Sequence, residues 1–195
     1  IQSMREMIEG KEVLLMVPGN TLNTHRELID EYVAKNKLVI ISVNFIADNF
    51  SAYAFFGNAK RYARLKNKRN GRNVIISSNI KSDTDDDIVV NYHSLINRGY
   101  EYFENSTIML LNLLKRINPS KVTIVGFDGF DVNTDENYVD SSYQNERHVE
   151  EFEILNDEIS KMFRDVVEIM YPACQFNILT PSLYERAMKS IIDRR

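Results

Sequence analysis

The sequence predicts a Rossmann-like, three-layer α/β/α fold with a mostly parallel sheet, and three observations support this prediction. Short runs of apolar, β-branched residues alternate with longer charged segments along the chain. Several of these runs are apolar at nearly every position, which is typical of strands covered on both faces. The longer segments carry apolar residues at helical spacing, so strand and helix alternate as they do in α/β folds.

The apolar runs give the predicted strands. In chain order they span residues 13–17, 38–43, 53–56, 73–76, 88–90, 122–125 and 176–179. Three segments between them have the pattern of helices. Residues 24–34 place Leu28, Ile29 and Tyr32 on one face, and residues 105–116 are apolar nearly all round, which is typical of a helix packed on several sides. From Val149 to Val166, apolar residues recur at helical spacing among acidic residues, which predicts a long amphipathic helix.

Three polar segments interrupt this alternation. Residues 61–72 are strongly basic and predict either a solvated helix face or a site for a phosphate or an acidic partner. Residues 83–87 (DTDDD) are acidic and predict a loop. Residues 129–147 are rich in Asp, Asn and Tyr and weakly periodic, which predicts a long excursion from the sheet. Because loops of that length inside a compact domain are more often functional than idle, this excursion is a candidate for ligand contact.

Composition excludes several classes of protein. A length of 195 residues predicts a single domain over residues 1–195, and the one cysteine, Cys174, rules out an internal disulfide and fits the cytoplasm. The formal charge of −4 argues against a nucleic-acid partner. No apolar run approaches the ~20 residues that a membrane span needs. The three histidines show no metal-ligand spacing, so no metal site is predicted.

Candidate ligand-binding residues follow the predicted strands, because ligands of open parallel sheets bind beyond the carboxyl ends of the strands. The first strand is followed by Gly19, Asn20 and Thr21, where a glycine would let backbone amides approach a phosphate at a helix start. The alternative is a simple turn in which Asn20, Thr21 or Asn23 caps the helix. Asn44 and Asn58 follow the next two strands, and their amides suit a ribose or a base edge.

Two further residues are candidates for chemistry. Asp128 lies between two glycines after the sixth strand, where it would bind a hydroxyl or, through water, a divalent ion; the alternative is a turn aspartate bonded to its own backbone. His148 stands where the polar excursion meets the long helix and is the best candidate for a general acid or base. Its alternative is a solvent-exposed histidine at a helix start.

Several short motifs together resemble a known family. They are the strand followed by PGNTL and a helix, SVN after the second strand, the helix start Asn105-Ser106, VTIVGFDGF, the Tyr-bearing loop and the closing ILTPS. They resemble the sialyltransferase-like, DUF115-type Rossmann domains, a superfamily that includes bacterial sialyltransferases, motility accessory proteins and archaeal hydroxymethylpterin diphosphokinases. More closely, GKEVLLMVPGNTL with VISVNF and VGFDG is similar to a domain appended C-terminally to bacterial aldolases. Those hosts have a barrel of the 4-hydroxy-2-oxovalerate aldolase or hydroxymethylglutaryl-CoA lyase type, often encoded among surface-polysaccharide genes.

The sialyltransferase resemblance implies roles for individual residues. Gly19 and Asn20 would contact the nucleotide phosphates, and Asn44 and Ser106 would reach the donor nucleotide. The first loop departs from the family, whose form is richer in glycine and carries Pro-Ser. This departure weakens an assignment of sialyl transfer more than one of nucleotide binding.

The same resemblance implies that the excursion supplies the reactive groups. Tyr138 and Tyr143 would bind the phosphate and assist the leaving group, and His148 would lie near the general base.

The sequence leaves three functions open. The first hypothesis is a nucleotide or nucleotide-sugar binding domain, of the CMP- or UDP-sugar type, within a longer aldolase-like chain; if it is an enzyme, it is a glycosyltransferase-like transferase. The second is a non-catalytic module that assembles or docks the aldolase barrel of the same chain. The third is a pterin-type diphosphokinase. The lyase chemistry itself would lie outside this segment, because the barrel needs about 250 residues. The oligomeric state stays open, and Ile1 suggests a segment excised from a longer chain or a removed tag.

Overall fold

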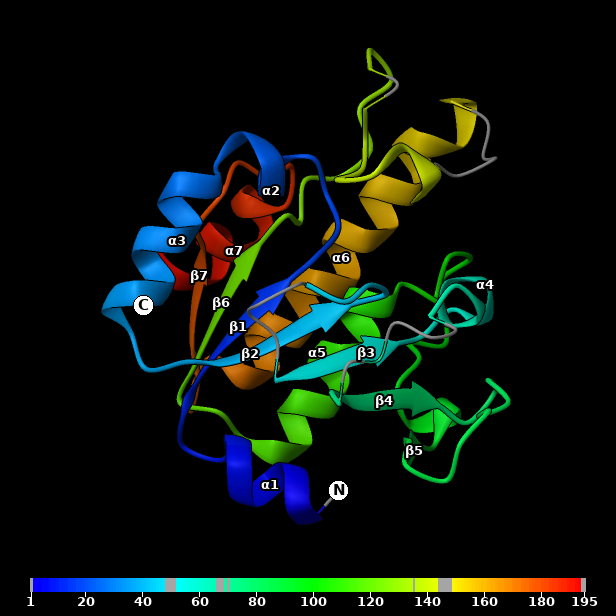
Figure 1. Ribbon diagram of the computed structural model, residues 1–195. Coiled ribbons are helices and arrows are strands. Elements are labelled where there is room, and N and C mark those ends of the chain that lie inside the picture. Colours follow the sequence, from blue (N-terminus) through cyan, green and yellow to red (C-terminus); the bar gives the residue numbers. More distant parts are fainter. Residues whose placement is uncertain are drawn as a thin grey trace.

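A computed structural model describes residues 2–47, 52–65, 69, 71–134, 136–143 and 149–193. Its sheet has the strand order β5-β4-β3-β2-β1-β6-β7, and all pairs of neighbouring strands are parallel (Figure 1). The strands are β1 (Glu12–Met16), β2 (Val39–Val43), β3 (Tyr53–Phe56), β4 (Asn73–Ser77), β5 (Ile88–Val90), β6 (Lys121–Val125) and β7 (Gln175–Ile178). The prediction of a three-layer, Rossmann-like α/β fold is confirmed, and no end of a predicted strand differs from the structure by more than one residue.

Helices precede, separate and follow these strands. The α-helices are α1 (Gln2–Ile8), α2 (Thr21–Thr24), α3 (Arg26–Lys35), α4 (Ala59–Ala63), α5 (Ser106–Ile117), α6 (Phe152–Met170) and α7 (Glu185–Ile192). Single turns of 3-10 helix are η1 (Tyr92–Ser94), η2 (Ser141–Tyr143) and η3 (Val149–Glu151). The predicted helices correspond to α3, α5 and α6, whereas α1 and α7 lie outside the segments predicted as helical. The start of the basic run lies in α4, and its other described residues, 64, 65, 69, 71 and 72, lie outside any helix.

The two faces of the sheet are covered differently. On one face α1, α5, α6 and α7 pack over a single continuous apolar cluster, and Figure 1 shows α5 and α6 behind the strands in this view. Nearly every residue of α5 is buried, as its apolar pattern predicts. On the other face the apolar side chains form two separate clusters. Leu22 and Ile29 of α2 and α3 belong to the first, and Tyr62 of α4 belongs to the second.

This division follows from the connection between β2 and β3. Residues 44–52 alone join the two parallel strands, and the described part of this link, 44–47 and 52, contains no helix. Parallel strands are usually joined by a dozen or more residues that include a helix covering the sheet. Because that helix is missing from the described link, α3 covers β1 and β2, α4 covers β3 and β4, and a gap separates them.

The long segment after β6 leaves the sheet, as its composition predicts. Figure 1 shows the part between β6 and α6 extending away from the strands at the top of the view. Its end returns to the first loop: Val139 donates its N–H to the Pro18 carbonyl at 3.0 Å, and the Asn23 amide donates to the Val139 carbonyl at 2.9 Å. No helix in the described part of the chain is long and apolar enough to cross a membrane.

Candidate functional site

The loops that follow β1, β2, β3 and β6 meet the start of α5 at the carboxyl edge of the sheet. Two adjoining pockets of about 110 and 210 Å³ open there, and we call them together the carboxyl-edge crevice. The pockets share the lining residues Pro18, Asn44, Asn105, Ser106, Phe130 and Tyr138. The chain adds β2 to β5 in order on one side of β1 and then crosses to place β6 on the other side, so the strand order reverses at β1, where the crevice lies. Such a topological switch point is the usual ligand site of an open α/β sheet.

The crevice brings together six of the residues selected from the sequence. These are Gly19, Asn44, Asn58, Ser106, Asp128 and Tyr138. Asn20 and Thr21 instead line a different pocket, of about 650 Å³, into which Asp128 also opens. Their proximity does not test the ligand-binding roles predicted for these residues, which stay predictions. Their contacts, however, show which residues hold the loops together and which face the crevice.

Gly19 serves the packing of two loops against each other. Its N–H donates to the Gly126 carbonyl at 2.9 Å, and a Cβ at position 19 would lie 2.4 Å from that carbonyl oxygen. Only a residue without a side chain therefore fits between the β1 and β6 loops. This requirement accounts for Gly19 without a ligand, so its contact with a phosphate stays a prediction.

Asp128 braces the start of α2. One carboxylate oxygen accepts from the Thr21 N–H at 2.8 Å, and the other accepts from the Thr21 hydroxyl. The Thr21 hydroxyl also lies 3.0 Å from the hydroxyl of Thr180, which in turn accepts from the Gly126 N–H at 2.9 Å. Burial raises the pKa of Asp128 above its ordinary value, and the bonds from Thr21 oppose this shift. Asn20 makes no side-chain capping bond, so Asp128 performs the capping that the sequence suggests for the turn residues.

Replacing Asp128 tests this bracing role. We expect Asp128→Ala to lower the free energy of unfolding by about 2 kcal/mol, because two hydrogen bonds to a charged acceptor are lost. Asp128→Asn should cost less than about 1 kcal/mol, since its Oδ1 can accept from the Thr21 N–H and its Nδ2 can donate to the Thr21 hydroxyl. Urea denaturation of the two variants measures the difference, and equal losses would contradict the assignment.

Asn44 joins the ends of β2 and β3. It has a positive φ of 62°, its N–H donates to the Phe55 carbonyl at 2.7 Å, and its Oδ1 accepts from the Gly57 N–H at 3.2 Å. Its Nδ2 makes no hydrogen bond to any described residue, although Asn44 lines both pockets of the crevice. Asn58 has a different role: its Oδ1 caps α4 by accepting from the Arg61 N–H at 3.1 Å.

Ser106 is the first residue of α5 and lines both pockets of the crevice. The helix is capped by Asn105, whose side chain accepts from the N–H groups of Thr107 and Ile108 at 3.0 and 3.1 Å. Ser106 is only 8% exposed, yet its hydroxyl makes no hydrogen bond within the described part of the chain. Gly57 lies directly against it, since a Cβ at position 57 would be 2.7 Å from the Ser106 Oγ. The Oγ itself remains accessible from the crevice, so water or a ligand can complete its bonding.

Aromatic and cationic side chains form another wall of the crevice. The ring of Tyr138 meets Phe130 edge-on at a centroid distance of 6.1 Å, and the Arg61 guanidinium lies 5.2 Å from the Tyr138 centroid. The Tyr143 backbone lies in η2, and nothing is described of its side chain. His148 lies outside the described residues. The predicted roles of Tyr143 and His148 in catalysis therefore stay predictions.

The sequence interpretation missed several residues that shape the crevice. The side chain of Asn156 in α6 makes two hydrogen bonds to the Phe130 backbone. Its Oδ1 accepts from the Phe130 N–H at 3.0 Å, and its Nδ2 donates to the Phe130 carbonyl at 2.7 Å. The same side chain accepts from the hydroxyl of Tyr184 at 2.8 Å, and burial raises the pKa of Tyr184 well above its ordinary value. In the sequence Asn156 is one polar residue of an amphipathic helix, so no local signal identifies it.

Fold and site together define a class of protein: an α/β protein with a crevice at the carboxyl edge of its parallel sheet. The crevice lies at a topological switch point and is lined by the start of a buried helix and by polar loop residues. No family model matches the sequence, and no curated protein matches it significantly.

Proposed function

We propose that this chain binds a nucleotide or nucleotide-sugar in the carboxyl-edge crevice, with a phosphate at the start of α5. The observation that carries the proposal is the Ser106 hydroxyl, which belongs to a largely buried residue and lines the crevice without a hydrogen-bond partner among the described residues. The first N–H groups of a helix and its dipole favour an anion at this position. A phosphate oxygen would accept from the Ser106 hydroxyl and from its backbone N–H.

The remaining walls suit the other parts of a nucleotide. The Asn44 amide nitrogen would donate to a base or ribose oxygen, because no described residue uses its hydrogens. Tyr138 offers an aromatic face, and Arg61 adds a positive charge beside it. Glu101 and Glu104 line the larger of the two pockets that form the crevice, where their carboxylates would accept from ribose hydroxyls.

Catalysis is a further step that the resemblance to sialyltransferase-like domains suggests. Tyr138 and Tyr143 would assist departure of the nucleotide, and His148 would deprotonate an acceptor hydroxyl. The domain would then act as a glycosyltransferase-like part of an aldolase-type polypeptide in surface-polysaccharide synthesis. Asp128, on which the diphosphokinase alternative depends, has both carboxylate oxygens engaged by Thr21, so no observation favours that alternative.

Calorimetric titration with CMP, UDP and ATP derivatives tests nucleotide binding. We expect a saturable heat with at least one of them and an affinity about tenfold lower in Ser106→Ala, because a charge-assisted hydrogen bond is lost. Ser190→Ala on α7 is the matched control, since among the described residues that hydroxyl bonds only to the Ala187 carbonyl, and its loss should leave binding unchanged. Absence of heat with every nucleotide would contradict the proposal and favour the docking module.

A separate variant distinguishes a catalytic domain from a binding domain. Once a nucleotide-sugar has been found to bind, His148→Ala should abolish turnover and leave the dissociation constant unchanged. Turnover that survives in this variant would remove His148 from the mechanism.

A further inference from the structure

A larger pocket adjoins the crevice and shares Asn44 with it. It has a volume of about 610 Å³ and occupies the gap between α3 and α4 that the short link from β2 to β3 leaves over the sheet. On this face the apolar core is divided into two clusters, and the pocket touches both of them. We call it the inter-helix pocket.

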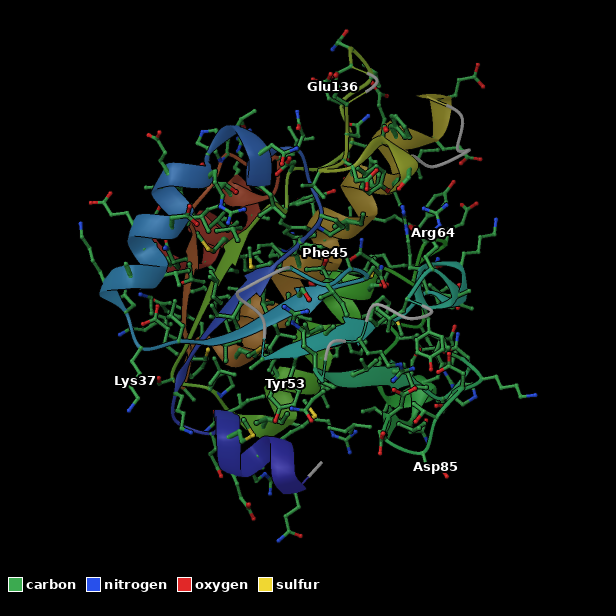
Figure 2. All side chains as sticks on the ribbon, viewed as in Figure 1. Lys37, Phe45, Tyr53, Arg64, Asp85 and Glu136 are labelled. Carbon is green, nitrogen blue, oxygen red and sulfur yellow. The ribbon has the colours of Figure 1, made fainter. Side chains whose placement is uncertain are left out.

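The floor of the inter-helix pocket is apolar. Leu22 and Ile29 come from the first cluster, Phe56 and Leu65 come from the second, and Ala47 of the connecting link lies with them. All five residues are buried. Phe45, labelled in Figure 2, adds an aromatic ring to the lining where β2 ends. A ligand that filled this gap would remove apolar surface from water, at about 25 cal/mol per Å².

The rim of the pocket is positively charged. Arg26 projects from α3, Arg61 from α4 and Arg64 from the position directly after α4, and Asp140 is the single acidic side chain among the described residues that line the pocket. The Arg26 Nε already donates to both carboxylate oxygens of Asp30, at 2.9 and 3.0 Å, so an anion in the pocket would bind the terminal nitrogens of this guanidinium group. Because the chain as a whole carries a charge of −4, this concentration of guanidinium groups is a local feature. Arg64, labelled in Figure 2, donates to the Ser142 carbonyl, and a guanidinium group has five N–H donors with which to bind more than one acceptor.

We propose that the inter-helix pocket binds a small organic anion with an apolar body, such as an aromatic or aliphatic carboxylate, sulfonate or phosphate ester. The apolar body would lie on the floor between the two clusters, and the anionic group would lie between Arg26 and Arg64. This inference does not rest on the proposed nucleotide site. The two sites adjoin, however, since Asn44 and Arg61 line both the inter-helix pocket and the crevice.

Fluorescence titration with 1-anilinonaphthalene-8-sulfonate tests the inference, because this probe combines an aromatic body with one sulfonate. The neutral analogue N-phenyl-1-naphthylamine serves as the comparison. We expect one saturable site for the sulfonate, binding about tenfold more weakly in Arg26→Gln/Arg64→Gln, whereas binding of the neutral analogue should be weak in both proteins. Both arginines are exposed, so their replacement should not disturb folding.

Two further variants establish the location. Arg186→Gln removes one guanidinium charge from an exposed position on α7, on the other face of the sheet, and should leave the affinity unchanged. Ala47→Phe fills the floor and should abolish binding without lowering the melting temperature, because the new ring enters the existing gap. An unchanged sulfonate affinity in the double arginine variant, or equal affinity for the neutral analogue, would overturn the inference. Failure of nucleotides to bind would leave these results unaffected, so the two proposals fail separately.

Discussion

Replacing Gly126 with alanine is expected to lower the free energy of unfolding by about 4 kcal/mol, because two costs coincide at this position. Gly126 has a φ of +71°, a conformation that costs an L-residue roughly 1–2 kcal/mol. In addition, its Cβ would lie 1.9 Å from the Val17 carbonyl oxygen. Since that neighbour is backbone of the β1 loop, relief requires the loops after β1 and β6 to separate, and overpacking of this kind costs about 1–3 kcal/mol more.

Gly10 provides the matched control. It has a φ of +69°, but a Cβ there would meet no atom within 4 Å. Gly10→Ala should therefore lower the free energy of unfolding by only about 1 kcal/mol, which is the cost of a positive φ for alanine. Urea denaturation at constant slope measures both variants. If the two losses were equal, the close approach of the β1 and β6 loops would not contribute to stability, and the geometry assigned to the crevice would be wrong.

The strands are predictable from the sequence because each is a short, nearly continuous apolar run. Burial on both faces makes nearly every position of a central parallel strand apolar, so such a strand can be found in the sequence without an alternating pattern of apolar and polar residues. The terminal helices give weaker signals. In α1 the two residues that enter the core are Met4 and Ile8, and in α7 they are Met188 and Ile191. These helices have only seven and eight residues, so each covers about two turns, which is too short to establish a helical period in the sequence.

Sequence position brings several of the selected polar residues to the crevice, because parallel strands all end at the same edge of the sheet, although Asn20 and Thr21 line a different pocket. It does not predict which of them remain available to a ligand. Asp128 and Ser106 are both plausible ligands in the sequence, but the oxygens of Asp128 bond to Thr21, which is distant in the chain, and the Ser106 hydroxyl bonds to no described residue. That distinction depends on contacts between loops, which no local pattern encodes.

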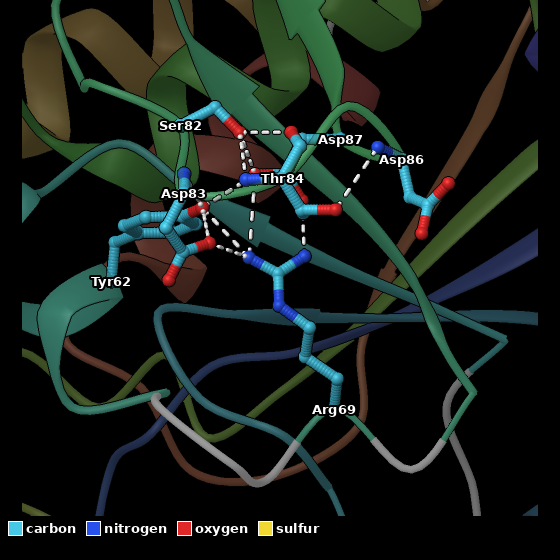
Figure 3. A network of polar contacts seen from close by, with 7 residues as sticks. All are labelled: Tyr62, Arg69, Ser82, Asp83, Thr84, Asp86 and Asp87. Carbon is cyan, nitrogen blue, oxygen red and sulfur yellow. Dashed lines mark hydrogen bonds and ion pairs between the residues drawn. The ribbon is translucent and has the colours of Figure 1, made fainter.

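A second large effect is expected at the outer edge of the sheet, where the acidic loop 83–87 meets the basic segment that follows α4. Arg69 donates to Asp87, which also accepts from the hydroxyls of Tyr62 and Ser82 at 2.5 and 2.6 Å (Figure 3). A second branch runs from Arg69 to the Tyr62 hydroxyl at 2.7 Å, and that hydroxyl also lies 2.6 Å from a carboxylate oxygen of Asp83, so its single hydrogen is shared between Asp83 and Asp87. The Asp87 side chain is completely buried, so its charge depends on these donors.

Asp87→Ala should therefore lower the free energy of unfolding by about 3 kcal/mol, because Arg69, Tyr62 and Ser82 each lose their shared acceptor. Asp85→Ala is the matched control in the same loop. Its side chain is exposed, so the change should stay within about 0.5 kcal/mol. Thermal or urea denaturation separates the two variants, and an Asp87→Ala variant as stable as Asp85→Ala would mean that the network does not hold β5 in place.

The pH dependence of stability gives an independent measure of the same carboxylate. Burial by itself raises the pKa of Asp87, but hydrogen bonds from Arg69, Ser82 and Tyr62 outweigh burial and hold the pKa below its ordinary value of 3.8. A carboxyl group whose pKa is lowered by folding stabilises the protein above its unfolded pKa, and this contribution disappears as the pH falls through the folded pKa. The free energy of unfolding should thus fall more steeply below pH 4 in the wild type than in Asp87→Asn. Parallel curves for the two proteins would show that Asp87 gains no stabilisation from its ionised form, and the loss in Asp87→Ala would then come from packing alone.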